Sequence, residues 1–552
     1  PTQTPTPTQT EDPEVLAARA EQQAKEEAEK HAETVRMFPK GETQSRSLRC
    51  IGWRATADCN PHGAREPSGD FSCAKLIPNG HSGYCEVEDK SSGERFRVMR
   101  RHCNSLRYEA AFRCSDAADF AHYPLKARQA VDKALQPGFA LPNVDQSASE
   151  SREGIVMVVY PKLLASAYAT IRVLRDDLDC RLPIEIWFLP KEMQKFPAAL
   201  EPLRELAASD TNSEITFHEV RDPLAKEFRA KVFAIYHSFF DRVLFLDADN
   251  VPVRDPSFLF DSDEFKKTGA VFWPDFWHPT STIFNIHSQS LLWELLDLPF
   301  ANMFEQESGQ LLVDRRRHAV PLELVHFYAF QHPNHLNRLK LAHGDKDLFR
   351  LAWLKQFEAF HMIQTPPAVA GKVISNSFCG MTMVQHDASG NVLFLHRNSH
   401  KLTGIPHLEA GDTRAKAVER ARKKLVLKDP NGRLTPKFSE VQSELAAMAT
   451  SPASTMEAPE PDGYPDPAIW THLLSFRNGS RRVDYVIETY NADPEFPKAQ
   501  NCYGQRNLTK SSHFHAQEVK DSSFSWLETH LRRYAMEAAQ LHQKKLNVLL
   551  ET

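Results

Sequence analysis

Two acidic residues, Asp247 and Asp249, stand one residue apart directly after the apolar run Val243 to Leu246. An apolar run of this length between polar residues is typical of a buried strand in a parallel sheet. Open α/β sheets bind their ligands just beyond the carboxyl ends of such strands. Two carboxylates at this spacing can share a divalent cation, and Mg²⁺ or Mn²⁺ prefers hard oxygen ligands together with substrate phosphates. The spacing therefore indicates a metal bridge from the protein to a diphosphate.

The segments around these acids alternate between strand-like and helix-like patterns, which is typical of an α/β fold with a doubly wound parallel sheet. Strands are expected at 155–160, 184–189, 215–220 and 268–273, and helices at 163–179, 196–208, 223–239 and 284–304. A hairpin is expected over 376–387 and 391–398. The first strand is not followed by a GxGxxG motif, so the sequence does not support a dinucleotide site.

The composition of the chain favours a globular protein of the secretory lumen. The 552 residues carry a net charge of −5 with 41% hydrophobic residues, and no apolar run approaches the length of a membrane span. Six of the nine cysteines lie between positions 50 and 114, which is unusual for a reducing compartment. Asn478 and Asn507 begin N-glycosylation sequons. Because the chain starts at Pro1 without a methionine, an N-terminal anchor could have been removed upstream.

Changes in composition suggest five regions. They are a Pro/Thr-rich and helical stem (1–45), a cysteine-rich module (46–120), an α/β domain (150–405), an irregular excursion (406–465) and a C-terminal segment packed on the α/β domain (466–552). The six cysteines of the module show no CxxC spacing, so we expect three disulfides rather than a zinc site. Of Cys180, Cys379 and Cys502, at least one is then expected to be a free thiol. Residues 115–150 are interpreted as a connector, and Arg315 to Arg317 as surface or ion-paired residues.

Several longer sequence blocks resemble a known family. The blocks FLDADNVPVRDPSFLF, TGAVFWPDFW, EQESGQLLVDRRRH, GDKDLFRLAW and TMVQHD…LFLHRN occur in the order found in the fungal-type Golgi α-mannosyltransferases. The resemblance covers about 154–400. It implies a GT-A-type (Rossmann-like) nucleotide-sugar transferase domain, distantly similar to glycogenin-like retaining enzymes. It also implies a Mn²⁺ (or Mg²⁺) cofactor and a nucleoside-diphosphate sugar donor, expected to be GDP-mannose.

The resemblance assigns the metal ligands to a DxD motif and one histidine. Asp247, Ala248 and Asp249 form the motif, and its two acids bind the metal and the donor diphosphate. Glycogenin-like enzymes take a third ligand from a histidine near the end of the domain, and His396 in LFLHRN is the best match. His386 and His400 are its competitors. A satisfied core histidine is the alternative interpretation of His396.

The resemblance also places residues around the donor sugar. Tyr160, Lys231, Gly309 and Lys346 are expected to bind the donor, Lys346 standing where the family carries an amide. Catalytic roles are expected for Glu307, Asp345 and Asp347, the last two being the acids of an acidic triplet. Either acid of that triplet could instead be an N-terminal charge on the helix that follows. Glu305 is an alternative to Glu307.

Acceptor binding is expected at an aromatic loop. Trp273, Asp275, Phe276 and Trp277 offer aromatic rings for the C–H faces of sugars and a carboxylate for hydroxyl groups. The alternative is that these aromatic residues belong to the core.

Together these features predict a metal-dependent transferase that moves α-mannose from GDP-mannose to a mannose-containing glycan with retention, by front-face attack or double displacement through Glu307 or Asp345. The expected partners are a nucleotide sugar and a glycan or glycoprotein acceptor, without nucleic acid. The expected location is the Golgi lumen, as the luminal part of a type II membrane protein. Alternatives are a UDP-sugar enzyme and a non-catalytic glycan-binding protein. An aspartyl phosphatase with Asp247 as nucleophile is a further alternative.

Overall fold

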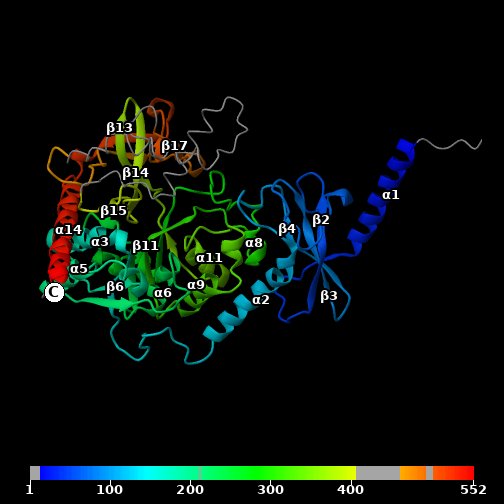
Figure 1. The fold of residues 1–552 in the computed structure, drawn as a ribbon, viewed down its shortest axis with the longest axis horizontal. Helices are drawn as coiled ribbons and strands as arrows, with labels where there is room; N and C mark the ends of the chain where they lie inside the picture. Colours follow the sequence, from blue (N-terminus) through cyan, green and yellow to red (C-terminus); the bar gives the residue numbers. More distant parts are fainter. Residues whose placement is uncertain (1–12, 211–212, 406–459, 493–500, 552) are drawn as a thin grey trace, which may run out of the picture.

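The computed structural model describes residues 13–210, 213–405, 460–492 and 501–551 (Figure 1). The expected Pro/Thr-rich linker at 1–11 and residues 406–459 of the expected excursion lie outside this part of the chain. No helix in these ranges combines the length and the apolarity needed to span a membrane.

The N-terminal part consists of one projecting helix and a small sheet (Figure 1). Helix α1 (Pro13–Thr34) confirms the helix predicted for the stem. The sheet has the strand order β1-β4-β3-β2. Its strands are β1 (Arg36–Met37), β2 (Leu48–Thr56), β3 (Ser82–Asp89) and β4 (Arg95–Arg101).

The three disulfides predicted for the cysteine-rich module are confirmed. They join Cys50 to Cys73, Cys59 to Cys103 and Cys85 to Cys114. A fourth disulfide joins Cys379 to Cys502, and Cys180 is a free, buried cysteine. The prediction of at least one free thiol among the last three cysteines is therefore confirmed.

The interpretation of 115–150 as a plain connector is wrong for its first half, which forms helix α2 (Ala117–Ala134). Phe120, Tyr123, Ala127 and Val131 recur at helical spacing and are buried. The Tyr123 ring lies 5.2 Å from that of Phe327 in helix α9 (Ala319–Phe330). Helix α2, which follows the cysteine-rich module, thus packs against α9 of the α/β domain.

The main sheet confirms the predicted α/β class, but it is mixed rather than wholly parallel. Its strand order is β12-β10-β11-β8-β5-β6-β7. Strands β5 to β8 run parallel to their neighbours within this group, whereas β11 runs antiparallel to both β8 and β10. The strands are β5 (Glu153–Val159), β6 (Ile184–Phe188), β7 (Ile215–Glu219), β8 (Arg242–Leu246), β10 (Ala270–Pro274), β11 (Gln306–Asp314) and β12 (His361–Met362).

Helices cover both faces of this sheet, and successive residues of β5 accordingly pack in two different cores. Val156 and Val158 of β5 pack in one core with α6 and α9, and Ile155 and Met157 pack in the other with α3 and α14. The remaining helix bounds are α3 (Leu164–Arg172), α4 (Pro190–Met193), α5 (Glu201–Ser209), α6 (Arg229–His237), α7 (Asp263–Thr268), α10 (His335–Arg338), α11 (Leu348–Gln356) and α14 (Leu527–Glu551).

The helix predicted for 284–304 is wrong except for one turn, α8 (Leu292–Leu295). Asp297 adopts a left-handed backbone conformation with φ 47°, and Pro299 lacks the amide hydrogen that a helix needs. The rest of this segment is loop. The segment contacts the cysteine-rich module through Glu294 of α8, which pairs with Arg100, and through Asn285 and His287 of the loop, which contact the Asn104 carbonyl.

A second sheet joins the end of the α/β segment to the C-terminal segment. Its order is β17-β18-β14-β13-β16-β19, and β15 pairs with both β14 and β9. The antiparallel pairing of β14 with β15 confirms the predicted hairpin. The strands are β9 (Asn250–Pro252), β13 (Ala368–Ile374), β14 (Ser377–His386), β15 (Val392–His396), β16 (His472–Phe476), β17 (Glu488–Asn491), β18 (Asn501–Gln505) and β19 (Phe514–Glu518).

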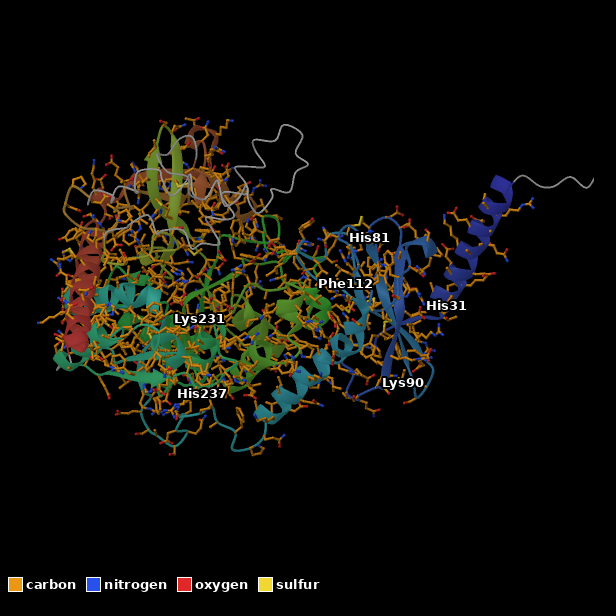
Figure 2. All side chains as sticks on the ribbon, in the orientation of Figure 1. His31, His81, Lys90, Phe112, Lys231 and His237 are labelled. Carbon is orange, nitrogen blue, oxygen red and sulfur yellow. A yellow bond between two sulfur atoms is a disulfide. The ribbon has the colours of Figure 1, made fainter. Side chains whose placement is uncertain are left out.

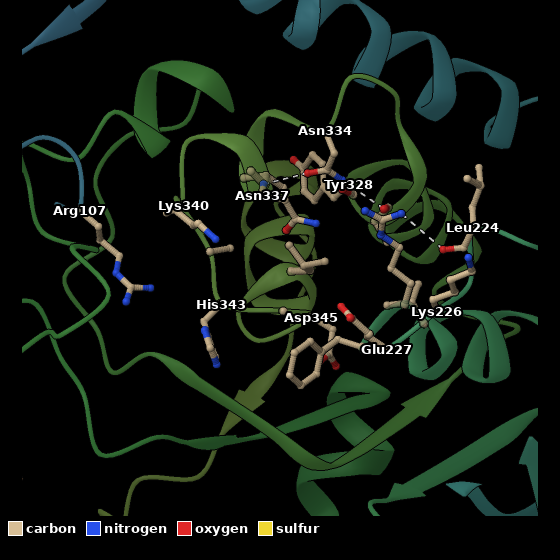
Figure 3. Close-up of a pocket in the computed structure, with 18 of the residues that line it drawn as sticks. Arg107, Leu224, Lys226, Glu227, Tyr328, Asn334, Asn337, Lys340, His343 and Asp345 are labelled. Atoms are coloured by element: carbon tan, nitrogen blue, oxygen red, sulfur yellow. Dashed lines mark hydrogen bonds between the residues drawn. The ribbon is translucent and has the colours of Figure 1, made fainter. Parts of the chain in front are cut away.

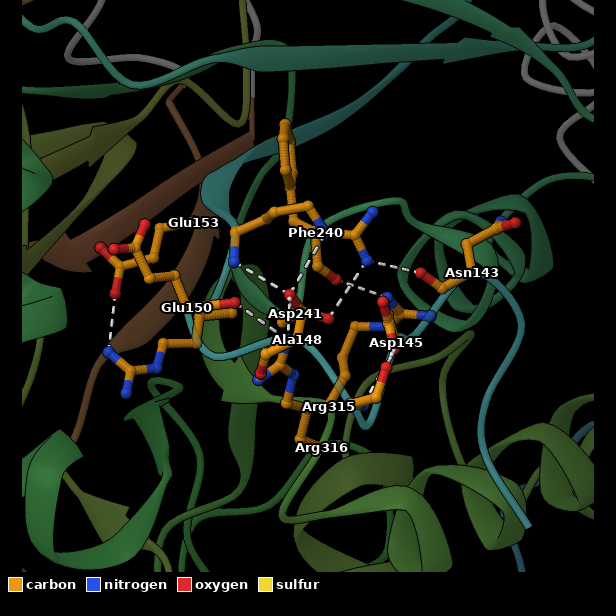
Figure 4. A network of polar contacts seen from close by, with 12 residues as sticks. Asn143, Asp145, Ala148, Glu150, Glu153, Phe240, Asp241, Arg315 and Arg316 are labelled. Carbon is orange, nitrogen blue, oxygen red and sulfur yellow. Dashed lines mark hydrogen bonds and ion pairs between the residues drawn. The ribbon is translucent and has the colours of Figure 1, made fainter. Parts of the chain in front are cut away.

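The interpretation of the arginine run as surface or ion-paired residues is wrong for Arg315, which is fully buried. Its guanidinium donates hydrogen bonds to backbone carbonyls, including those of Pro142 and Tyr236 at 2.7 and 2.8 Å. The neighbouring Arg316 pairs with the buried Asp241 at 3.1 Å (Figure 4). This polar network fixes the chain entering β5 against the start of β8.

Candidate functional site

The two acids of the DxD motif leave the carboxyl end of β8 and lead directly into β9. The Asp247 backbone N–H donates to the carbonyl of Gly309 at 2.8 Å, which fixes the end of β8 against β11. Strand β9 pairs antiparallel with β15, and the register places His396 opposite Asn250. This pairing brings a histidine from a distant part of the sequence beside the acids.

Asp247, Asp249 and His396 form a cluster that fits a divalent metal ion. One ligand atom from each residue lies within 4.8 Å of the others. His396 Nε2 lies 3.4 Å from Asp249 Oδ1 and 3.8 Å from Asp247 Oδ2. Two carboxylates and an imidazole suit Mn²⁺, which accepts both hard oxygen and nitrogen ligands.

The competing histidines lie outside this cluster. His386 is the last residue of β14 and is buried, and burial lowers its pKa to about 4. Neither His386 nor His400 belongs to the metal-compatible group found among the described residues.

The cluster sits in a dense network of opposite charges. Burial opposes the charged form of His396, but Asp249 and Glu307 outweigh it and raise the pKa of the imidazole to about 10. Burial likewise opposes ionisation of Glu307, but His396 and Lys231 bring its pKa down to about 2. Lys401 and His396 lower the pKa of Asp249 against the same burial penalty. Asp249 is therefore ionised, as a carboxylate ligand of a cation must be, and Glu307 beside it is ionised as well.

Two lysines contact the acids of the motif, one at each aspartate. Lys231 on α6 is buried, and its Nζ donates to the Ser308 carbonyl at 2.7 Å and to Asp247 Oδ2 at 3.2 Å. Figure 2 shows Lys231 inside the larger part of the molecule. Lys401 contacts Asp249 Oδ2 and donates to the Arg397 carbonyl at 2.7 Å. Lys231 is a predicted site residue, whereas sequence reasoning missed Lys401.

Strand β11 supplies Glu307 and Gly309 to the site. The Gly309 N–H donates to Glu307 Oε1 at 2.7 Å, and that oxygen lies 3.4 Å from His396 Nδ1. A Cβ atom at position 309 would lie 2.5 Å from His396 Nδ1, closer than real Cβ contacts allow. A glycine is therefore required for the imidazole to occupy its place.

The acidic triplet separates into residues with different environments. Asp345 faces the site, where its Oδ2 lies 3.4 Å from Lys231 Nζ, and burial raises its pKa to about 6. Asp347 is fully buried, and it accepts the Gln306 N–H at 2.8 Å and pairs with Arg350. Its contacts are those of a structural residue.

The ammonium group of Lys346 is occupied by acidic partners. It pairs with Glu305, lies 3.0 Å from Asp275 Oδ2 and 3.5 Å from Asp347 Oδ2, and only 6% of the residue is exposed. Lys346 thus stands where the resembling family carries an amide side chain, and its positive charge is balanced by the neighbouring acidic side chains.

The four residues predicted to bind the acceptor lie in the interior. Trp273 is fully buried, and its indole N–H donates to the His386 carbonyl at 2.8 Å. Phe276 and Trp277 pack in a hydrophobic cluster with residues of the C-terminal segment, and Asp275 faces Lys346. The core interpretation of this loop fits these contacts.

Two further predicted donor residues differ in their surroundings. Tyr160 lines the cavity described below, and its hydroxyl donates to the Glu227 carbonyl at 2.7 Å. Ala248 is buried in the core beneath the motif, and its carbonyl accepts the Thr170 hydroxyl at 3.1 Å. Ala248 can therefore contribute packing but not a side-chain contact to a ligand.

The site opens into a cavity of about 960 Å³, within the size range of pockets that hold cofactors and substrates. Asp247, Asp249, His396, Glu307 and Lys231 lie in its lining. Two half-exposed aromatic residues, Phe196 and Phe228, line it as well. Sequence reasoning missed these two rings because an isolated aromatic residue in a predicted helix carries no signal of exposure.

Residues 152–387 match the family model described as "Mannosyltransferase putative". The chain is 24% identical over 279 residues to the α-1,2-mannosyltransferase MNN2 of Saccharomyces cerevisiae, covering 42% of this chain and 45% of the relative. It is 25% identical over 310 residues to the α-1,2-mannosyltransferase MNN21 of Candida albicans, covering 47% and 46%. The chain spans about half the length of these curated relatives. The resemblance predicted from the motifs is confirmed for this segment.

Among solved structures, the mannosyltransferase Ktr4p of S. cerevisiae is similar at a TM-score of 0.27 and 11% sequence identity. The match covers 43% of this chain and 76% of that structure.

Proposed function

We propose that this chain is a metal-dependent retaining glycosyltransferase that transfers α-mannose from GDP-mannose to a mannose-containing glycan, in protein glycosylation or cell-wall mannan synthesis. The observation that carries the proposal is the cluster of Asp247, Asp249 and His396 on the wall of a large cavity. Two of these three residues lie in the segment that matches a mannosyltransferase family.

The chemical problem of this reaction is the charge that grows on the leaving diphosphate as the sugar bond breaks. Asp247, Asp249 and His396 would hold Mn²⁺ or Mg²⁺, which when bound supplies Lewis-acid stabilisation of that charge. Lys231, fixed by Ser308 and Asp247, places a second positive charge on the same wall. Lys401 contacts Asp249 and its side chain is about one-third exposed, so it can turn towards a bound phosphate.

The two candidate catalytic acids are engaged by positive groups. Glu307 accepts the Gly309 N–H and lies beside His396, and Asp345 lies beside Lys231. These contacts favour electrostatic stabilisation of an oxocarbenium-like state over nucleophilic attack on the sugar. We therefore favour front-face transfer, in which the acceptor hydroxyl gives its proton to the departing phosphate.

The proposed location is the Golgi lumen, with the chain as the luminal part of a type II membrane protein. Four disulfides support an oxidising compartment. The relatives that match are named as yeast α-mannosyltransferases.

The product of a transfer reaction tests this proposal. Purified chain, Mn²⁺, GDP-mannose and an α-linked mannose oligosaccharide are expected to give an oligosaccharide one mannose longer. Nuclear magnetic resonance of the new linkage should show the α configuration. A β-linked product would contradict retention, and extension from a UDP-sugar alone would contradict the proposed donor.

A further inference from the structure

We infer that a second cavity binds an oligosaccharide acceptor. This cavity is formed between the α/β domain (150–405), here called the catalytic part, and the cysteine-rich module (46–120). The inference rests on the proposed glycosyl transfer, and it gives the module a role in acceptor binding. It also moves the acceptor site away from the aromatic loop at 273–277, whose side chains are buried.

The second cavity has a volume of about 640 Å³ and adjoins the cavity that contains the metal-compatible cluster. Figure 3 shows Arg107 and Lys226 on opposite sides of it, with Asp345 between them. Four residues line both cavities: Glu227, Phe228, His343 and Asp345. A ligand in the second cavity therefore reaches the wall that faces the proposed donor sugar.

The module reaches this cavity through the loop that carries Arg107 and Glu109. The loop lies between Cys103 and Cys114, and both of these cysteines form disulfides within the module. It is also attached to the catalytic part, because the Ser105 hydroxyl donates to the Gln289 carbonyl at 2.6 Å. The loop that carries Arg107 is therefore fixed both by the disulfides of the module and by a hydrogen bond to the catalytic part.

A series of ring contacts connects Arg107 to the shared wall. Its guanidinium carbon lies 5.5 Å from the ring centroid of Phe284, and that ring stacks on His343 at 4.8 Å. Lys346 Nζ lies 4.0 Å from the Phe284 ring centroid. The Phe228 ring lies 5.9 Å from His343. The module thus contacts, through Arg107, a ring cluster in which Phe228 and His343 line both cavities.

The chemistry of the lining suits a neutral, hydroxyl-rich ligand. Asn337, Lys340 and Glu109 are exposed and offer hydrogen-bond donors and acceptors of both charge signs. Phe228 is 51% exposed, and its ring offers a flat apolar surface for the C–H face of a sugar. Gly344, at φ +65°, leaves room for this ring, because a Cβ there would lie 2.7 Å from it.

Calorimetric titration tests the two sites separately on the intact chain. GDP with Mn²⁺ probes the proposed donor site, and a linear α-mannotetraose probes the second cavity. The test variants are Arg107→Ala and Lys340→Ala. Their matched controls are Arg113→Ala, in the same module loop, and Lys90→Ala, at an exposed position of the module (Figure 2). Neither control residue is among the described residues that line the cavity.

Each test variant is expected to weaken tetraose binding about threefold to tenfold, the value of one or two hydrogen bonds. GDP affinity should stay within error of the parent, and both controls should bind the tetraose like the parent. Equal tetraose affinity in parent and test variants, or no tetraose binding by the parent, would overturn the inference while GDP binding upholds the donor site. Failure of the parent to bind GDP would instead overturn the proposed function.

Discussion

At the scale of single residues, Gly309 is the position where one methyl group tests the geometry of the cluster. In Gly309→Ala the new Cβ would lie 2.5 Å from His396 Nδ1 and 2.9 Å from Glu307 Oε1, so the imidazole must move. We expect Mn²⁺ affinity, measured by calorimetry, to fall about 10-fold to 100-fold, as when a group that orients a metal ligand is lost.

A control for this substitution is Gly80→Ala, since a Cβ at Gly80 meets no atom within 4 Å. Gly80→Ala should reduce stability slightly, because alanine disfavours the positive φ of this position, but it should leave the Mn²⁺ affinity unchanged. Unchanged Mn²⁺ affinity in Gly309→Ala would show that His396 is not a ligand.

The acids themselves allow a second test at this scale. Asp247→Asn and Asp249→Asn keep the size of the side chain but remove one negative charge near Lys231 or Lys401. We expect the rate of mannose transfer to fall at least about 100-fold, because the loss of charge stabilisation is worth several kcal/mol. The far-ultraviolet circular dichroism spectrum should stay unchanged. Full activity in either variant would remove that residue from the proposed metal site.

The predictability of the site differs from residue to residue. The spacing of Asp247 and Asp249 after an apolar run identified the metal-compatible acids from the sequence alone. His396 came only from the resemblance, because its place depends on the pairing of β9 with β15, which no local pattern encodes. The burial of Trp273 and Trp277 could not be predicted, since aromatic residues serve equally in cores and in sugar sites.

At the scale of elements, Asp241 joins the connector to the start of β8 (Figure 4). Burial raises the pKa of this carboxyl, but Arg152 and Arg316 outweigh it, and the net pKa lies below the ordinary value of 3.8. A lowered pKa in the folded state gives stability that is present above pH 3.8 and is lost as the pH falls further. Asp241→Asn should therefore reduce the free energy of unfolding by about 1–3 kcal/mol at pH 7.

The difference between parent and Asp241→Asn should shrink as the pH falls below 3.8, and urea titrations at several pH values measure it. Glu150→Gln is the matched control, because Arg316 contacts the backbone carbonyl of Glu150 and not its carboxylate. If the difference in the free energy of unfolding between parent and Asp241→Asn stayed constant down to pH 2, a stabilising role for the ionised Asp241 carboxylate would be contradicted.

The disulfide between Cys379 and Cys502 joins β14 to β18 and closes a loop with a sequence separation of 123. In the chain-entropy model a loop of this length is worth about 4–5 kcal/mol. The double variant Cys379→Ala and Cys502→Ala should lower the thermal midpoint much more than Cys180→Ala, which removes a buried thiol but breaks no disulfide. Equal shifts in the two variants would contradict a stabilising role for this bond.

The helices and strands were predicted well where the apolar residues of a segment followed one clear pattern. The runs that became β5, β6 and β8 were found because both faces of these strands are covered, whereas β7, at the edge of the sheet, was found from its β-branched and aromatic residues although only Ile215 in it is buried. The helix expected at 284–304 failed because Asn285 and Asp297 adopt left-handed backbone conformations and Pro299 lacks an amide hydrogen, which the apolar pattern of the segment does not reveal. The antiparallel direction of β11 depends on tertiary connections, which the pattern of the strand itself does not reveal.

At the scale of the whole molecule, the α/β segment supplies the acids, the second sheet supplies the histidine, and the cysteine-rich module borders the neighbouring cavity. The sequence indicated the disulfides of the module but not its position. That position depends on contacts such as Arg100 with Glu294 and Ser105 with Gln289, between residues far apart in the chain.

The central claim is that this arrangement cleaves a nucleotide sugar with the help of a divalent cation. The most direct measurement is donor-sugar hydrolysis by the purified chain across a panel of GDP- and UDP-sugars, with Mn²⁺ and then with excess EDTA. We predict cleavage of GDP-mannose that requires Mn²⁺ and stops in EDTA. Cleavage that persists in EDTA would contradict the metal site, and no cleavage of any donor, with no thermal shift on adding nucleotide, would contradict the proposed function.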